Sequence, residues 1–183
     1  MAGGASTGAA VTTGGISARA GPASWRDLGA IVRLYRAQPA GSRLFYHPFP
    51  FDRTRLGGVL AAIVVLQSAR RRTVRRLPAL APLLWVVRSS DPDRVLGFGT
   101  ATFHRDAGGT LVVRTGLFVA PDARRLGVGR LLKQTLLAES AQLGARRAEA
   151  ILVAANEPSR ELNRSLGYRL RPTEFHDPRA PGV

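Results

Sequence analysis

One stretch of the sequence, residues 110–143, constrains the fold more than any other, because it joins a strand, a glycine turn and a helix. A β-branched and aromatic run begins at Thr110 and ends at Pro121, a composition typical of a strand. Residues at helical spacing follow, and Gly144 ends the pattern. These residues are Val128, Leu131, Leu132, Thr135, Leu136 and Leu143. The sequence therefore places Gly127 and Gly129 at the N-terminus of an amphipathic helix.

A helix N-terminus of this composition suits a bulky anion. The first turn leaves backbone N–H groups unpaired and carries the positive end of the helix dipole. Gly127 and Gly129 remove two β-carbons where an anion would approach the backbone. Arg124, Arg125 and Arg130 add charged donors around the same turn. We expect a diphosphate to bind here.

Two common phosphate loops do not fit the turn. No third glycine follows Gly129 at the dinucleotide-binding spacing, and no Gly-Lys-Ser/Thr run of a nucleotide P-loop is present. A Gly-x-Gly turn alone is also compatible with a tight strand-to-helix connection that carries exposed arginines. The wider sequence context is needed to decide between these readings.

The context resembles a known family. The run Arg-Arg-Leu-Gly-Val-Gly at residues 124–129 matches a Gln/Arg-x-x-Gly-x-Gly/Ala loop, and a Leu-x-Val-x-Pro strand end precedes it at residues 117–121. A second signature runs from Asn156 to the Leu-Gly-Tyr at residues 166–168. Both resemble the GCN5-related N-acetyltransferase (GNAT) superfamily, over roughly residues 111–171.

The resemblance implies a single α/β domain with a mixed, mostly antiparallel central sheet, flanking helices and two strands that splay apart at the acyl-CoA site. We place this domain at residues 16–172, after a disordered tail at 1–15 and before a C-terminal tail at 173–183. Besides the segment at 110–143, the patterns predict strands at 16–19, 83–88, 95–104, 149–155 and 167–171. They predict helices at 24–39, 56–68 and 158–166, the first with a Ser24 and Asp27 capping box.

The resemblance also implies the cosubstrate, acetyl-CoA or a related acyl-CoA, with no metal. Its pyrophosphate would lie on the backbone of the glycine turn, and its pantetheine arm would run along the preceding strand. The residues implied in this binding are Leu117, Phe118, Val119, Arg124, Arg125, Leu126, Gly127, Val128, Gly129, Arg130, Asn156 and Ser159.

Two catalytic positions depart from the family pattern. The frequent general acid, a Tyr that follows the helix Leu, is replaced by Asn163, which can donate a hydrogen bond but not a proton. The frequent Glu on the central strand is also missing, and His104 is the best-placed substitute for a base. His47, Glu157 and a water chain are the other candidates.

The acceptor is implied only as a primary amine. The ring-rich segment at residues 41–52 offers Tyr46 and His47 as substrate contacts, although its phenylalanines suit a loop packed on the core edge. The departures at the acid and base leave open a second function, an acyl-CoA sensor of the same fold that does not catalyse transfer.

The charge of +15 arises from 27 Lys and Arg residues against 12 Asp and Glu residues, and it favours anionic partners. An arginine-rich nucleic-acid-binding protein is a third alternative, but no aromatic stacking platform accompanies the arginines of residues 69–76. The lack of Cys suits a reducing compartment, and neither a secretory signal nor a membrane span is visible. We therefore expect a cytoplasmic protein; a homodimer is left open.

Overall fold

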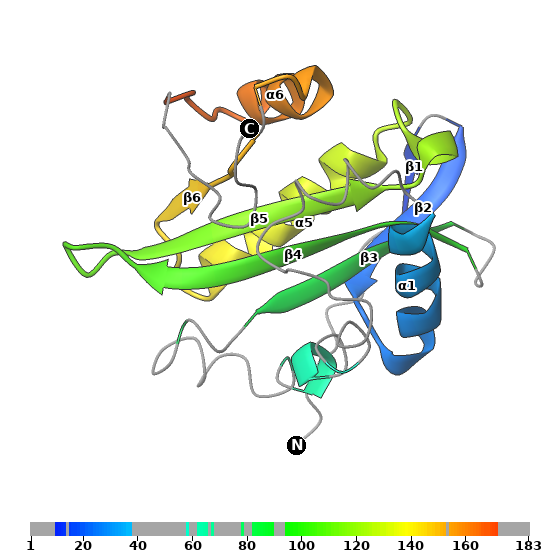
Figure 1. Cartoon of the computed structure of the whole chain (residues 1–183), viewed down its shortest axis with the longest axis horizontal. Coiled ribbons are helices and arrows are strands. Elements are labelled where there is room, and N and C mark those ends of the chain that lie inside the picture. Colours follow the sequence, from blue (N-terminus) through cyan, green and yellow to red (C-terminus); the bar gives the residue numbers. More distant parts are fainter. Residues whose placement is uncertain are drawn as a thin grey trace, which may run out of the picture.

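A six-stranded sheet lies at the centre of the molecule (Figure 1). The structure, a computed structural model, describes residues 10–13, 15–37, 58, 62–65, 67, 78, 82–89, 94–152 and 154–171. The strands follow one another across the sheet in chain order. They are β1 (Ala10–Thr13), β2 (Ile16–Pro22), β3 (Leu83–Ser89), β4 (Val95–Arg105), β5 (Leu111–Val119) and β6 (Arg147–Glu149). All neighbours are antiparallel except β5 and β6, which are parallel.

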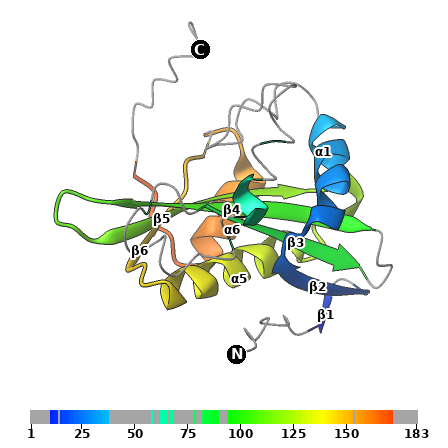
Figure 2. The ribbon, with the colours of Figure 1, turned by 90° about the horizontal axis from the view of Figure 1, so that it is seen from below.

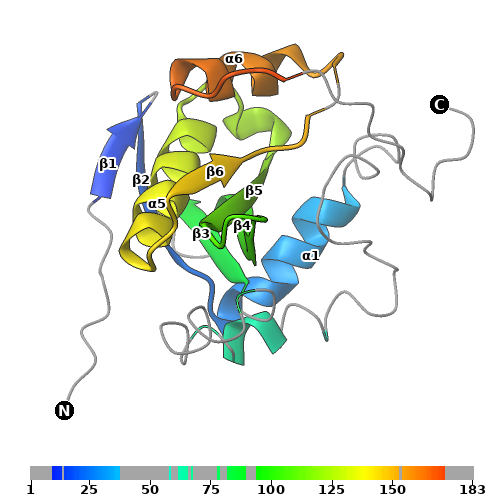
Figure 3. The same ribbon diagram turned by 90° about the vertical axis from the view of Figure 1, so that its left-hand side faces the viewer.

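Helices cover both faces of this sheet (Figure 2). Helix α5 (Val128–Gln142) packs on one face, where Val128, Leu132 and Leu136 are fully buried. Helix α1 (Leu28–Arg36), which follows the short 3-10 turn η1 (Trp25–Asp27), packs on the other face through Ile31 and Tyr35. Two hydrophobic cores therefore sandwich the sheet. Helix α6 (Glu157–Ser165) follows β6 in the chain and lies above β5 and β6 in the view of Figure 3.

A glycine lets α5 approach the sheet closely. A Cβ on Gly99 of β4 would lie 2.7 Å from Leu136 Cδ1 and 2.8 Å from Leu117 Cδ2, closer than real Cβ contacts allow. The absent side chain at Gly99 thus fixes how close α5 lies to β4 and β5.

Most elements lie where the sequence predicts them, and the predicted α/β class with a mixed, mostly antiparallel sheet is confirmed. Three predictions are corrected. Residues 10–13 form β1, so at least this part of the predicted disordered tail pairs with β2. The strand expected at 149–155 is only Arg147–Glu149. No strand forms at 167–171, where the backbone of Tyr168 instead donates to the carbonyl of Asn163.

Other predictions lie wholly or partly outside the described residues. The ring-rich segment with Tyr46 and His47, residues 1–9 and the tail from residue 172 are among them. Of the helix predicted at 56–68, the structure describes residues 58, 62–65 and 67, and all six are helical.

A buried ion pair ties the start of α1 to the sheet. The Asp27 carboxylate accepts hydrogen bonds from the backbone N and Oγ of Ser24, both at 2.6 Å, as the predicted capping box requires. It also accepts from Arg88 Nε at 2.8 Å and from a second Arg88 nitrogen at 2.5 Å. Burial favours the protonated acid, but the bonds from Arg88 and Ser24 outweigh it, so the pKa of Asp27 lies below its ordinary 3.8.

We expect Asp27→Ala to lower the free energy of unfolding at pH 7 by about 2 kcal/mol, because it removes a cap and leaves Arg88 without its partner. The pKa of Asp27 is depressed in the folded state, so the stability that it contributes is present above pH 3.8 and is lost as the pH falls through the folded-state pKa. Urea unfolding should therefore show a smaller difference in the free energy of unfolding between Asp27→Ala and the wild type near pH 3 than at pH 7. The matched control is Asp122→Ala, which breaks the exposed ion pair with Arg94 and should cost under about 0.5 kcal/mol. Equal stability of Asp27→Ala and the wild type at pH 7 would contradict this account.

Candidate active site

The pairing of β5 with β6 stops halfway along β5. The parallel register runs from Val112 opposite Arg147 to Arg114 opposite Glu149. Strand β5 continues to Val119, but described residues 150–152 and 154–156 form no strand beside it. The second half of β5 therefore has an open edge on the side away from β4, as the predicted splaying of the two strands requires (Figure 3).

The pleat decides which backbone groups face this open edge. The Leu111 carbonyl accepts from Arg146 N on the β6 side, whereas Ala120 N donates to Leu96 O on the β4 side. Because N–H and C=O groups alternate sides along a strand, the backbone groups of Leu117 and Val119 face the opening. Phe118 is placed differently: its ring stacks on Phe98 in the core, and its carbonyl points toward Gly97 of β4.

The glycine turn follows directly after the open edge. The short 3-10 turn η3 (Pro121–Ala123) leads into residues 124–127, and α5 begins at Val128. Both Arg125, at φ 64°, and Gly127, at φ 81°, adopt the left-handed conformation. The Gly127 carbonyl accepts the first bond of the helix, from Leu131 N at 3.0 Å. The N–H groups of Val128, Gly129 and Arg130 thus form the first turn, which has no intrahelical acceptors for them.

Two arginines of the turn reach across to α6. Arg125 forms an exposed ion pair with Glu161 at 3.4 Å, and Arg130 donates to Ser165 Oγ at 2.9 Å. Arg124 Nε lies 3.4 Å from the Val119 carbonyl. Two of the three predicted phosphate-binding arginines therefore contact α6, and the third lies against the end of β5.

Gly129 faces apolar atoms of β5 and α6. A Cβ added at Gly129 would lie 3.6 Å from both Val119 Cγ2 and Leu162 Cδ2, which is ordinary contact. Gly127 needs glycine for its backbone conformation, whereas Gly129 has room for a Cβ but lies close to Val119 and Leu162. Asn156 caps α6 by accepting a hydrogen bond from Ser159 N at 3.2 Å, so both of these predicted contacts lie at the N-terminus of α6.

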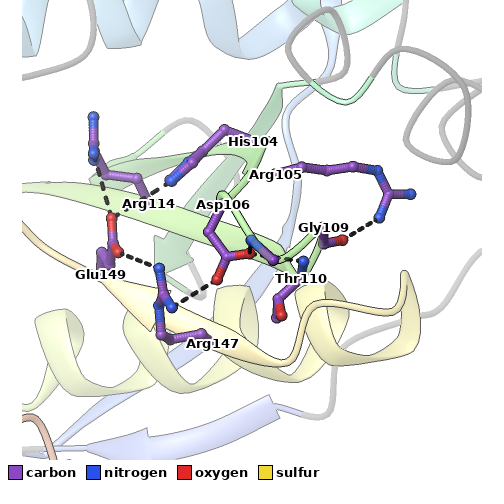
Figure 4. Close-up of polar contacts among 9 residues, drawn as sticks. His104, Arg105, Asp106, Gly109, Thr110, Arg114, Arg147 and Glu149 are labelled. Atoms are coloured by element: carbon purple, nitrogen blue, oxygen red, sulfur yellow. Dashed lines mark hydrogen bonds and ion pairs between the residues drawn. The ribbon is translucent and has the colours of Figure 1, made fainter.

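An ionic cluster lies beside the last paired residues of β5 and β6 (Figure 4). One Glu149 oxygen contacts Arg114 at 3.3 Å and His104 Nε2 at 3.7 Å, and the other accepts from Arg147 at 3.1 Å. Arg147 also pairs with Asp106 at 2.8 Å. His104, the predicted base, therefore has a carboxylate partner that the sequence did not suggest.

A second cluster is buried between β5, α5 and α6. Lys133 of α5 is only 2% exposed; its Nζ lies 2.5 Å from Thr115 Oγ1 and 4.7 Å from the centre of the Tyr168 ring. Asn163 is 4% exposed, donates from Nδ2 to the Ser159 carbonyl at 2.7 Å, and leaves Oδ1 without a hydrogen bond among the described residues. Burial lowers the pKa of Lys133 to about 8.

Sequence reasoning did not select Glu149, Lys133 or Tyr168 as candidate site residues. Glu149 meets His104 and Arg114 only through the strand register, which no local pattern fixes. A signal for Lys133 was present: it lies inside the apolar face of the helix predicted from residue 128, between Leu132 and Leu136. A lysine in such a position must be buried or must disturb the face.

These features agree with the comparisons to known proteins. A family model described as "Acetyltransferase (GNAT) family" matches residues 67–168, more than half of the 183-residue chain. The chain therefore belongs to the GNAT acetyltransferase family. No curated protein sequence matches it significantly.

Solved structures share the fold at low sequence identity. The structure of the aminoglycoside N-acetyltransferase AAC(6')-Iy in complex with CoA has a TM-score of 0.64 at 16% identity, covering 91% of this chain and 97% of that one. The putative acetyltransferase yncA from Salmonella typhimurium, solved with acetyl-CoA, has a TM-score of 0.60 at 20% identity, with 85% and 81% covered. An acetyltransferase of Trypanosoma brucei has a TM-score of 0.59 at 18% identity, with 87% and 98% covered.

Within the described residues, no helix is both long and apolar enough to cross a membrane. The same residues contain no group of three or more His, Asp or Glu side chains placed to hold a metal ion.

The backbone of the turn yields a test of its geometry. We expect Gly127→Ala to lower the free energy of unfolding by about 1 kcal/mol, because a β-carbon is strained at positive φ. Gly129→Ala should cost nothing measurable, since its Cβ meets only ordinary contacts and alanine favours the helix. Urea unfolding of the two variants measures the difference, and equal losses would contradict the left-handed turn at Gly127.

Proposed function

We propose that the chain transfers an acetyl group from acetyl-CoA to a primary amine, by direct attack of the amine on the thioester. One observation carries the proposal: the open edge of β5 leads straight into an N-terminal helix turn built for an anion. A ligand with a diphosphate at one end and an amide-containing arm at the other suits both features at once. Membership of the acetyltransferase family supports the same ligand.

The pyrophosphate would accept hydrogen bonds from the first-turn N–H groups of α5, with Arg124, Arg125 and Arg130 around it. The pantetheine arm would extend from there along the open edge and pair with the backbone of Leu117 and Val119, in the manner of an added strand. Val119 lies four positions after Thr115, about 13 Å of extended strand. The thioester would then lie near Thr115, close to where β5 and β6 meet.

His104 is the proposed general base. It would remove a proton from the amine during attack, and Glu149, 3.7 Å away, would stabilise the imidazolium that forms. Backbone N–H groups on the open edge of β5 would stabilise the oxyanion that develops on the carbonyl oxygen.

The acceptor itself is proposed only as a primary amine. The lack of Cys supports a reducing, cytoplasmic location.

Substitution of Gly129 tests coenzyme binding. Gly129→Leu should weaken acetyl-CoA binding about tenfold or more, because its side chain fills the space where the pyrophosphate meets the backbone. Gly29→Leu is the matched control: like Gly129 it is the second residue of a helix, but it is exposed on α1. Calorimetric titration with acetyl-CoA and CoA measures the affinity, and thermal unfolding checks that both variants fold. Undiminished affinity of Gly129→Leu would rule out this binding mode.

The same titration, followed by release of free CoA thiol across a panel of primary amines, tests the function as a whole. Binding with thiol release supports the enzyme, and binding without release on any amine supports an acyl-CoA sensor instead. Absence of binding would refute both.

Removal of the proposed base should affect turnover rather than binding. We expect His104→Ala to lower kcat about 100-fold with little change in the KM for acetyl-CoA, since a general base acts only in the transition state. Glu149→Gln should lower kcat by a smaller factor, because the imidazolium loses its carboxylate. Steady-state thiol release with the best amine of the panel measures both; wild-type turnover by His104→Ala would exclude it as the base.

A further inference from the structure

The buried cluster of Lys133, Thr115, Tyr168 and Asn163 has a chemistry that packing alone does not explain. The Tyr168 hydroxyl and the Asn163 Oδ1 are both buried and make no hydrogen bond of good geometry within the described residues. An ammonium group and two unpaired polar atoms in a core are each costly. Phe and Leu would fill the positions of Tyr168 and Lys133 without that cost.

The cluster lies near the proposed position of the coenzyme thioester, beside Thr115. Thr115 is the first β5 residue beyond the last pair with β6, Arg114 opposite Glu149. Its hydroxyl holds Lys133 Nζ at 2.5 Å, and Lys133 lies over the Tyr168 ring. Tyr168 therefore lies beside Lys133 and Thr115, next to the point on β5 where the pairing with β6 ends.

Asn163 does not supply the missing acid. Its Nδ2 donates to the Ser159 carbonyl, so the unpaired atom of its amide is Oδ1, an acceptor. A departing thiolate needs a proton donor. The Tyr168 hydroxyl lies against the Thr115 side chain but forms no hydrogen bond of good geometry within the described residues, so its proton is available.

We propose, on the basis of the acetyl transfer proposed above, that Tyr168 is the catalytic general acid that protonates the CoA thiolate, and that Lys133 resupplies its proton through Thr115. The amine nitrogen forms a bond to the carbonyl carbon, the C–S bond breaks, and its electron pair goes to sulfur. The sulfur then takes the phenolic proton to give CoA thiol, and the phenolate recovers a proton from the Lys133 ammonium group. Solvent reprotonates Lys133 and accepts the proton that the base removed from the amine.

The first transfer, from the phenol to a thiolate whose conjugate thiol has a pKa of about 8.5, is uphill, and the second transfer draws it forward. Burial raises the pKa of the Tyr168 phenol above its ordinary 10.0, and a contact from the Thr115 side chain offsets part of the rise. Burial moves the pKa of Lys133 in the other direction, to about 8. Proton transfer from the ammonium group to a phenolate is therefore downhill, and the positive charge over the ring stabilises the phenolate while it exists.

Tyr168→Phe is a sharp test because it removes only the hydroxyl and keeps the ring that lies under Lys133. We expect kcat to fall about 100-fold, with the KM for acetyl-CoA changed less than about threefold. The melting temperature should be unchanged or higher, and calorimetric titration should give the wild-type affinity for acetyl-CoA. Lys133→Met, which keeps a long unbranched side chain, should also lower kcat without lowering the melting temperature.

The outcomes separate this proposal from the function on which it rests. A wild-type chain that binds no acetyl-CoA, or releases no thiol with any amine, overturns both. If the wild type transfers acetyl groups and Tyr168→Phe turns over at the same rate, the general acid is wrong while the proposed function stands. A Tyr168→Phe variant that loses kcat and stability together would mark the residue as structural and would also overturn its role as acid.

Discussion

The constraint on which the site depends is the early end of the β5 and β6 ladder. Backbone N–H and C=O groups need partners wherever water is excluded. A parallel pair that stops at Arg114 and Glu149 leaves the groups of Leu117 and Val119 without a neighbouring strand. The other side of β5 is fully paired with β4, so its position is fixed. Whatever occupies the opening must offer alternating donors and acceptors, and the glycine turn that follows adds a preference for an anion at one end.

The glycine turn is also tied to α6 by side chains. Arg125 and Arg130 of the turn contact Glu161 and Ser165 of α6. Helix α6 also packs close to the turn, because Leu162 lies near Gly129. The proposed coenzyme site and the buried polar cluster therefore share α6 as a neighbour.

Charge is distributed differently in the two clusters next to β5. On the face covered by α1, Arg114, Arg147, Asp106 and Glu149 balance one another beside His104, and all of them reach solvent. On the face covered by α5, Lys133 has no acidic partner in any described ion pair and is held by a hydroxyl and an aromatic ring. A charge buried without a counterion readily changes its protonation state, because its desolvation is not repaid. The two clusters meet at neighbouring residues of β5, Arg114 and Thr115.

The sequence by itself determined the strand, the glycine turn and the helix between residues 110 and 142, because periodicity and glycine conformation are local properties. The capping box at Ser24 and Asp27 and the mixed sheet were also predictable, the latter through a family resemblance. Local patterns failed where pairing decides: β1 forms within an apparently featureless tail, β6 ends at Glu149 instead of 155, and residues 167–171 leave the sheet. Only the tertiary structure brought Glu149 to His104 and Lys133 to Thr115 and Tyr168, because these contacts join residues far apart in the chain, and register and helix packing, not local propensity, set them.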